Sequence, residues 1–178
     1  NGVFQRTQQI GIKGDHNWLT KAYGGLGNLY IVGGTNGNLA GANAGDYDIF
    51  IAKYDASGAP QWITQFGSSE QDTNSCISAD ASGNLFVAGS TEGDLWGANA
   101  GSRDPFLVNL DSNGDVQWGR QFGTTTSESA YGVSADGLGN VYIAETIDIE
   151  QIRVEAVVSK FDIQGALLST SHWGFGSQ

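Results

Sequence analysis

The sequence has 178 residues, enough for one folded domain with a core of its own. Nineteen acidic and eight basic residues give a net charge of −11, which repels phosphate backbones and anionic lipid heads, so nucleic acid and membrane surfaces are poor partners. A single cysteine excludes an internal disulfide framework, and two histidines leave little for a transition-metal site.

The chain is built from copies of one segment. Residues 27–58 and 83–114 are identical at 16 of 32 positions without a gap, at an offset of 56 residues. A third copy, 139–165, is five residues shorter, and the deletion falls between Thr146 and Val157. Counting back by the same period makes residues 1–11 the end of an earlier copy, with one outer strand at 3–10.

Each copy predicts four strands. In the second copy, short apolar runs at 76–80, 84–90, 105–110 and 115–122 alternate with turn residues, which indicates strands rather than helices. Four antiparallel strands per repeat, with a period of tens of residues, are typical of a propeller blade. The predicted fold is all-β, a beta-propeller domain over residues 1–178 with blades at 12–67, 68–123 and 124–178 and one leading outer strand.

Three motifs carry a resemblance to a known family. They read D-x-F-x-x-K-Y-D-x-x-G-x-x-x-W from residue 48, Q-F-G from residue 65 and S-A-D-x-x-G-N-x-x-x-x-G from residue 78. They resemble the bacterial SBBP-type beta-propeller repeat, over nearly the whole chain. The resemblance implies a secreted or surface-exposed repeat protein with no assigned reaction. The first copy departs at residues 22–24, and the third has Ser169 where the tryptophan stands, so we expect those blades to close less tightly.

Three side chains have an expected place in such blades. In this family the first strand of each blade lines the central axis, so Cys76, whose counterpart is Gly132, is expected to be a buried and inert small residue. Trp62 and Trp118 lie on outer strands, where they pack between blades or cover an edge. Stacking against a sugar is the alternative for both tryptophans.

The number of blades predicts assembly. Propellers usually close with four to eight blades, and three do not make a ring. The chain is therefore expected to form part of a larger or oligomeric propeller. Its partners would be the remainder of a parent chain, further copies in a homo-oligomer, or another protein.

Acidic residues fall into two groups. One group opens the tight turns, where a carboxylate accepts hydrogen bonds from the backbone two residues on; it comprises Asp55, Asp80, Asp111, Asp136 and Asp162. The other group lies in the loops after the second strand and between blades, which meet on one face. From it we take five calcium candidates, Asp46, Asp48, Asp72, Asp104 and Glu128. The alternative is a solvated acidic rim whose residues satisfy loop backbone groups.

Catalytic signatures are scarce. No Gly-x-Ser-x-Gly or phosphate-binding loop motif occurs, and neither His16 nor His172 has a recurring acid and serine nearby in the sequence. The sequence leaves paired carboxylates for glycoside cleavage open, because their separation arises only in three dimensions.

Composition and repeats together favour one function over two others. Few basic residues and one cysteine suit an extracellular or cell-surface bacterial protein, and the start at Asn1, without methionine or signal peptide, is typical of a mature or partial chain. No apolar run approaches the roughly 18 residues of a membrane span, so no membrane insertion is expected. We predict a non-enzymatic scaffold or interaction module without a cofactor, apart from the calcium option. A glycan- or calcium-binding module and a polysaccharide hydrolase or lyase are the alternatives.

Overall fold

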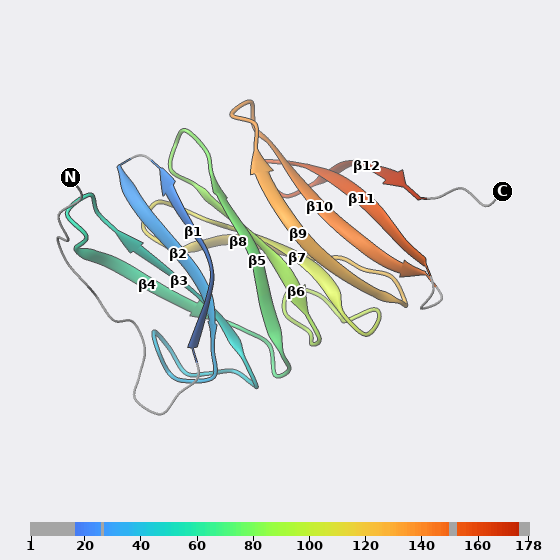
Figure 1. Ribbon diagram of the computed structural model, residues 1–178, viewed down its shortest axis with the longest axis horizontal. Coiled ribbons are helices and arrows are strands. Elements are labelled where there is room, and N and C mark those ends of the chain that lie inside the picture. Colours follow the sequence, from blue (N-terminus) through green and yellow to red (C-terminus); the bar gives the residue numbers. More distant parts are fainter. Residues whose placement is uncertain (1–16, 26, 150–152, 175–178) are drawn as a thin grey trace, which may run out of the picture.

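The computed structural model describes residues 17–25, 27–149 and 153–174. Within these ranges the chain forms twelve strands and no helix, and hence no helix that is long and apolar enough to cross a membrane. The strands make three four-stranded antiparallel sheets, each from four consecutive strands in chain order (Figure 1). This confirms the predicted all-β fold.

The strand bounds follow the repeat. Sheet 1 contains β1 (Asn17–Gly25), β2 (Asn28–Thr35), β3 (Asp48–Tyr54) and β4 (Pro60–Phe66). Sheet 2 contains β5 (Asp72–Ala79), β6 (Leu85–Thr91), β7 (Asp104–Leu110) and β8 (Val116–Gln121). Sheet 3 contains β9 (Ser127–Ala135), β10 (Asn140–Ile149), β11 (Arg153–Asp162) and β12 (Leu167–Trp173). The predicted leading strand, residues 3–10, lies outside the described residues, and the blade limits stay a prediction.

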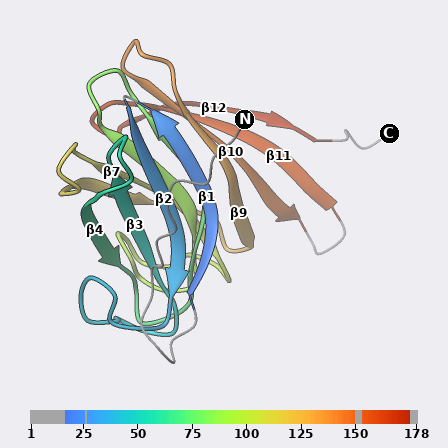
Figure 2. The ribbon, with the colours of Figure 1, turned by 60° about the vertical axis from the view of Figure 1, so that its left-hand side comes forward.

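Sheet 2 lies between the other two sheets (Figures 1 and 2). Every residue of β6 and β7 is buried, because both faces of these strands are covered. One core cluster joins sheets 1 and 2 and includes Ile51 and Phe106, and a second joins sheets 2 and 3 and includes Phe86 and Ile143. By contrast, every residue of β12 is exposed.

The first strands β1, β5 and β9 lie side by side (Figure 1). Cys76 on β5 is buried in the core between sheets 2 and 3, as predicted for a small residue on a first strand. Short parallel bridges, Tyr47 with Gln71 and Arg103 with Ser127, attach each sheet to the segment that opens the next.

The turn aspartates are confirmed as structural. Asp80 Oδ1 accepts hydrogen bonds from the backbone N–H of Ser82 (2.8 Å) and Asn84 (2.9 Å), and Gly83 closes the turn with φ of 88°. The four other turn aspartates accept from the same two backbone positions.

The tryptophans of the outer strands pack between sheets. Trp118 Nε1 donates to the Ile163 carbonyl at 3.0 Å, and its ring lies so close to Gly165 that a Cβ there would be 2.8 Å from it. Trp62 does the same one sheet earlier, with Nε1 3.1 Å from the Ser112 carbonyl. Each outer strand is thereby anchored to the last turn of the next sheet.

Candidate ligand-binding cavity

A glutamine holds the loop between the second and third strands of sheets 1 and 2. Gln121 Oε1 accepts from the backbone N–H of Leu95 (2.9 Å) and Trp96 (3.2 Å), while its Nε2 donates to Asp104 Oδ2 (3.1 Å). Gln65 makes the same set of bonds in sheet 1. The loop is therefore fixed against the outer strand.

In sheet 2, the loop between the second and third strands fills the space between sheets 1 and 2. The Trp96 ring lies 5.1 Å from the ring of Phe66 on sheet 1 and 5.7 Å from that of Phe106 on its own sheet. It also covers Gly119 of β8, where any Cβ would lie 2.2 Å from the indole. A glycine at position 119 is thus required by the tryptophan.

Sheet 3 lacks this loop, because β10 and β11 continue as one hairpin up to the pair Ile149 and Arg153. The space opens into a cavity of about 690 Å³, which we name the interblade cavity. Its lining includes Phe122, Val157 and Thr170. In the repeat these are the counterparts of Phe66, Phe106 and Gly119, the three residues that surround Trp96. The interblade cavity is therefore the place of the missing loop.

A carboxyl and a hydroxyl lie at the floor of the interblade cavity. Glu145 is 7% exposed and Ser159 is 4% exposed, and Ser159 Oγ donates to Glu145 Oε1 at 2.6 Å. Glu145 stands where sheets 1 and 2 have glycine, and Ser159 stands where they have alanine and valine. A bulge between Ala144 and Glu145 interrupts the pairing of β10 with β9 at this point.

The surroundings perturb the floor carboxyl. Burial raises the pKa of Glu145 above its ordinary value. The hydrogen bond from Ser159 lowers this pKa, the nearby Glu128 charge raises it and the His172 charge lowers it. The net direction is upward, so the neutral form of Glu145 is favoured more than for an exposed glutamate.

Two basic residues stand at the mouth of the interblade cavity. His172 Nδ1 lies 3.4 Å from Glu155 Oε2, and this pair takes the place of the glutamine and aspartate that fix the loops of the earlier sheets. The Arg120 guanidinium donates to the carbonyl of Gly165 (3.1 Å) and covers the Trp118 ring at 5.6 Å.

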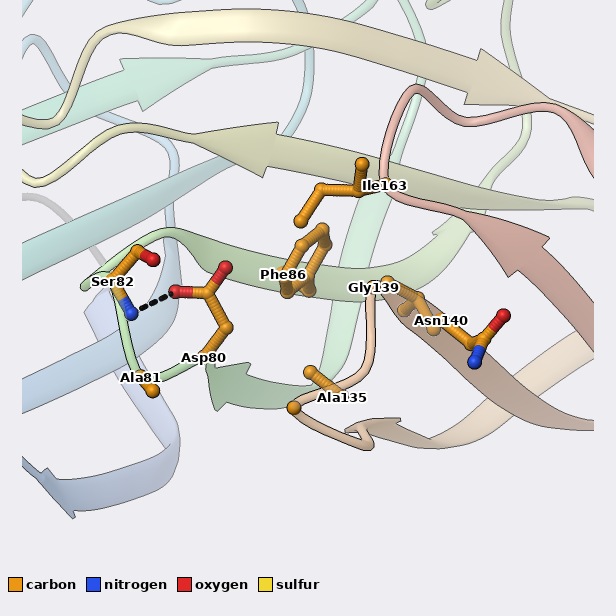
Figure 3. Close-up of a pocket in the computed structure, with 10 residues that line it drawn as sticks. Asp80, Ala81, Ser82, Phe86, Ala135, Gly139, Asn140 and Ile163 are labelled. Carbon is orange, nitrogen blue, oxygen red and sulfur yellow. Dashed lines mark hydrogen bonds between the residues drawn. The ribbon is translucent and has the colours of Figure 1, made fainter.

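A second hollow, of about 170 Å³, lies at the turns of sheets 2 and 3. Figure 3 shows Phe86 and Ile163 beside the turn of Asp80, whose carboxylate bonds to Ser82. The polar groups of this hollow belong to turn hydrogen bonds, so the interblade cavity is the stronger candidate site.

The structure separates the five predicted calcium candidates. Asp46 is exposed in the loop before β3. Asp48, Asp72 and Asp104 begin β3, β5 and β7, and Glu128 is the second residue of β9; all four are buried. Of these five residues, Glu128 lines the interblade cavity.

Donors from the loops already occupy most of these carboxylates. Asp48 accepts from the Ala44 N–H (3.1 Å), and Asp104 accepts from the Ala100 N–H (2.9 Å). The donors to Asp72 are Ser68 N–H and Oγ, and those to Glu128 are Thr124 N–H and Oγ1 with Thr126 Oγ1. These bonds are of the kind that the alternative of satisfied loop backbone groups predicts.

Two of the candidates approach each other across Gly67. A Cβ at Gly67 would lie 2.1 Å from Asp48 Oδ1 and 3.0 Å from Asp72 Oδ2. Asp104 Oδ1 is buried without a hydrogen-bond partner in the described part of the chain. Calcium takes six to eight oxygen ligands, and no group of three or more metal-binding side chains is arranged for an ion among the described residues.

Calcium is therefore expected to leave the melting temperature unchanged, within about 1 °C at millimolar concentration, since a ligand stabilises a fold only through a site that it occupies. Thermal unfolding with calcium and with a chelator measures this. A rise with calcium that Asp104→Asn abolishes would place an ion at Asp104 after all.

Glu145→Gln is expected to change how stability depends on pH. Because the folded state holds the Glu145 carboxyl at a raised pKa, it binds more protons than the unfolded chain above the ordinary glutamate pKa, and wild-type stability falls as pH rises through that range. Glu145→Gln has no titrating carboxyl at this position and does not lose stability in this way. Its free energy of unfolding relative to wild type should therefore rise from about pH 4 towards neutrality. Burial raises the pKa of Asp72 in both proteins, and the difference between them isolates Glu145.

Urea unfolding at a series of pH values measures that difference. Asp115→Asn, which removes the same charge from an exposed turn, serves as the control. A constant difference between Glu145→Gln and wild type at all pH values would contradict the assignment of Glu145 as a buried titrating group.

These sheets, with tryptophans between them and loops fixed by glutamines, define a repeat protein built of beta-propeller blades. A family model described as Beta-propeller repeat (SBBP) matches residues 61–95, which run from the outer strand of sheet 1 into the loop of sheet 2. Over these residues the chain matches the SBBP-type beta-propeller repeat that its motifs predict.

Two individual proteins are similar to parts of the chain. Regulatory protein FlaEY of Caulobacter vibrioides is 28% identical in an alignment of 98 positions that covers 51% of this chain and 10% of that protein. The solved structure of a luciferin-regenerating enzyme aligns with 82% of this chain and 72% of its own, at 13% identity and a TM-score of 0.30. A likeness at that level supports no inference about activity.

Apart from Glu128, sequence reasoning did not identify the residues that line the interblade cavity as a site. His172 lies beside Glu155, which is 17 residues earlier in the chain, on the neighbouring strand. Glu145 lies near His172 as well. A signal was present in the repeat, because Glu145 replaces a glycine, His172 replaces a glutamine and both changes accompany the deletion.

Proposed function

We propose that the chain is a non-enzymatic interaction module that works outside the bacterial cell, and that the interblade cavity is its binding site. The observation that carries this proposal is the cavity itself. At one junction the repeat loses the loop that closes the equivalent space and gains Glu145 and Ser159 at the floor. Cavities of about 300–1,000 Å³ with a few placed polar groups are typical of ligand sites.

The energetics of Glu145 support a functional role. A glycine is sufficient at this position in sheets 1 and 2, and burying a carboxyl in its place disfavours the folded state unless the group is paired. Positions where a protein departs from its own local rule in this way are expected at functional sites.

The rest of the repeat supports a scaffold role. The polar residues that recur in the repeats, such as Gln65 and Gln121, bond to their own loops and hold the sheets in a fixed shape. The excess of acidic residues and the single buried cysteine suit a protein outside the cell. A homo-oligomer, or further blades of a parent chain, would extend the same stack of sheets.

A fragment screen monitored by ¹⁵N NMR tests the binding site. We expect ligands to shift the amide signals of Glu145, Val157 and Ser159 and to lose that effect in Thr170→Trp, which fills the exposed mouth. Ser171→Trp is the matched control, because neighbouring residues on β12 point to opposite faces. Ligand shifts that lie elsewhere and survive Thr170→Trp would refute the proposed site.

A polysaccharide hydrolase or lyase is the second candidate, favoured by one observation. Glu145 and Glu128 both line the interblade cavity, and a carboxyl with a raised pKa is suited to act as a general acid. Release of reducing ends from bacterial polysaccharides, lost in Glu145→Gln, would support this candidate. Turnover that persists in Glu145→Gln would remove it.

A further inference from the structure

We propose that the interblade cavity selects an organic cation, that is, an ammonium or guanidinium group carried on an apolar stem. The inference rests on the proposed function of the cavity as a binding site and names the chemistry of its ligand. It stands on the free acceptor at the cavity floor, on the apolar walls and on the way the basic residues nearby are held.

The floor offers an acceptor for a charged donor. Ser159 Oγ occupies Oε1 of Glu145, and within the described residues Oε2 of Glu145 accepts no hydrogen bond. Neither Glu145 nor Glu128 takes part in an ion pair in that part of the chain. A cation that reaches Glu145 could donate a hydrogen bond to Oε2 and pair with the carboxylate, and hydrogen bonds between charged groups are the stronger kind.

The two basic residues that line the interblade cavity are bonded to other groups. Arg120 lies at the exposed mouth, where three backbone carbonyls and the Trp118 ring hold its guanidinium. His172, also at the mouth, pairs with Glu155. Neither residue forms an ion pair with Glu145 in the described part of the chain, so a ligand cation would be free to pair with it.

The walls suit the rest of such a ligand. The rings of Phe122 and Phe161 lie 5.2 Å apart at an angle of 44°, and Ile147 and Val157 complete an apolar surface. Aromatic faces attract ammonium and guanidinium groups, and they also cover an alkyl or aryl stem. A cavity of about 690 Å³ holds both the charged head and the stem.

The whole protein favours a positive ligand. The net charge of −11 attracts cations and repels anions at long range. Burial and the Glu128 charge raise the pKa of Glu145, and a bound cation would lower it again by stabilising the ionised form. Selection by charge thus acts both at long range and at the floor.

Calorimetry at pH 7 tests the inference with three probes of similar shape that differ in charge. They are phenethylamine, 2-phenylethanol and 3-phenylpropionate. We expect phenethylamine to bind at least about tenfold more tightly than the neutral alcohol, because it adds a charged hydrogen bond, and the anion not to bind measurably. Glu145→Gln should weaken phenethylamine by about tenfold and change the alcohol by less than about twofold.

Variants keep the test interpretable. Asp115→Asn removes a distant exposed charge and should leave all three affinities unchanged. If Glu145→Gln does not fold, Glu145→Gly restores the residue of sheets 1 and 2 and takes its place. Circular dichroism of each variant checks the fold.

The outcomes separate the two proposals. Equal affinity for the amine and the alcohol, blocked by Thr170→Trp, would overturn the cation and leave the binding site in place. Absence of binding by all three probes, together with a fragment screen that avoids the cavity, would overturn both. A capped Phe-Lys dipeptide distinguishes the source of the charge: tighter binding of the dipeptide indicates a polypeptide partner, and tighter binding of phenethylamine indicates a free amine.

Discussion

Trp96→Ala should lower the free energy of unfolding by about 3 kcal/mol, the lower end of the range for large aromatic residues because Trp96 is partly exposed. The change removes contacts with the rings of Phe66 and Phe106 and opens, between sheets 1 and 2, a space like the one between sheets 2 and 3. Urea unfolding followed by tyrosine and tryptophan fluorescence measures the loss.

The last strand provides the control for this prediction. Trp173 occupies the position in sheet 3 that Phe66 occupies in sheet 1, yet it is 60% exposed. Trp173→Ala should therefore change the free energy of unfolding by less than about 0.5 kcal/mol. Indole added to Trp96→Ala should raise its melting temperature and leave that of wild type unchanged. Equal losses in the two variants would show that Trp96 does not close the junction between sheets.

Gly101→Ala should destabilise the protein by about 3 kcal/mol, at the upper end of the range for overpacking. A Cβ at Gly101 would lie 2.0 Å from the carbonyl oxygen of Thr126 and 2.6 Å from that of Thr124. Both obstacles are backbone atoms of the segment that enters sheet 3, and the neighbouring Ser102 N–H bonds to the Thr126 carbonyl at 2.8 Å. The added methyl group therefore forces the connection between sheets apart.

Gly97→Ala in the same loop is the matched control, since a Cβ there would be 3.6 Å from the Gln121 Cβ, an ordinary contact. Its effect should stay below about 0.5 kcal/mol. Calorimetric melting of both variants measures the difference. Equal melting temperatures for the two would contradict the close approach of the loop to sheet 3.

The fold could be predicted from the sequence because its signals are local and repeated. An aspartate, a glycine three residues later and apolar runs on either side specify a turn between two strands, and the structure has such a turn at Asp80 and at Asp111. The pairing of Trp62 and Trp118 with the next sheet also followed from their recurrence on outer strands.

The site could not be predicted in the same way, because it depends on contacts between sheets. The sequence identified the deletion after Thr146, but it did not show that the lost loop carries the residue that fills a junction. The sequence placed the calcium candidates in loops, whereas four of the five lie buried at the starts of strands. Their partners are backbone N–H groups, as at Ala44 and Ala100, and those donors are invisible in the pattern of side chains.

The close fit of Trp96 on Gly119 also limits the order in which copies of this repeat can diverge. A copy that acquired a larger residue at the position of Gly119 while it kept the tryptophan of the loop would not pack. A copy that first lost its loop would tolerate the larger residue. Sheet 3, which has Thr170 at the equivalent position, is such a copy. Divergence of the repeat is in this respect one-way, since a sheet that has gained threonine cannot regain the tryptophan loop until the threonine reverts.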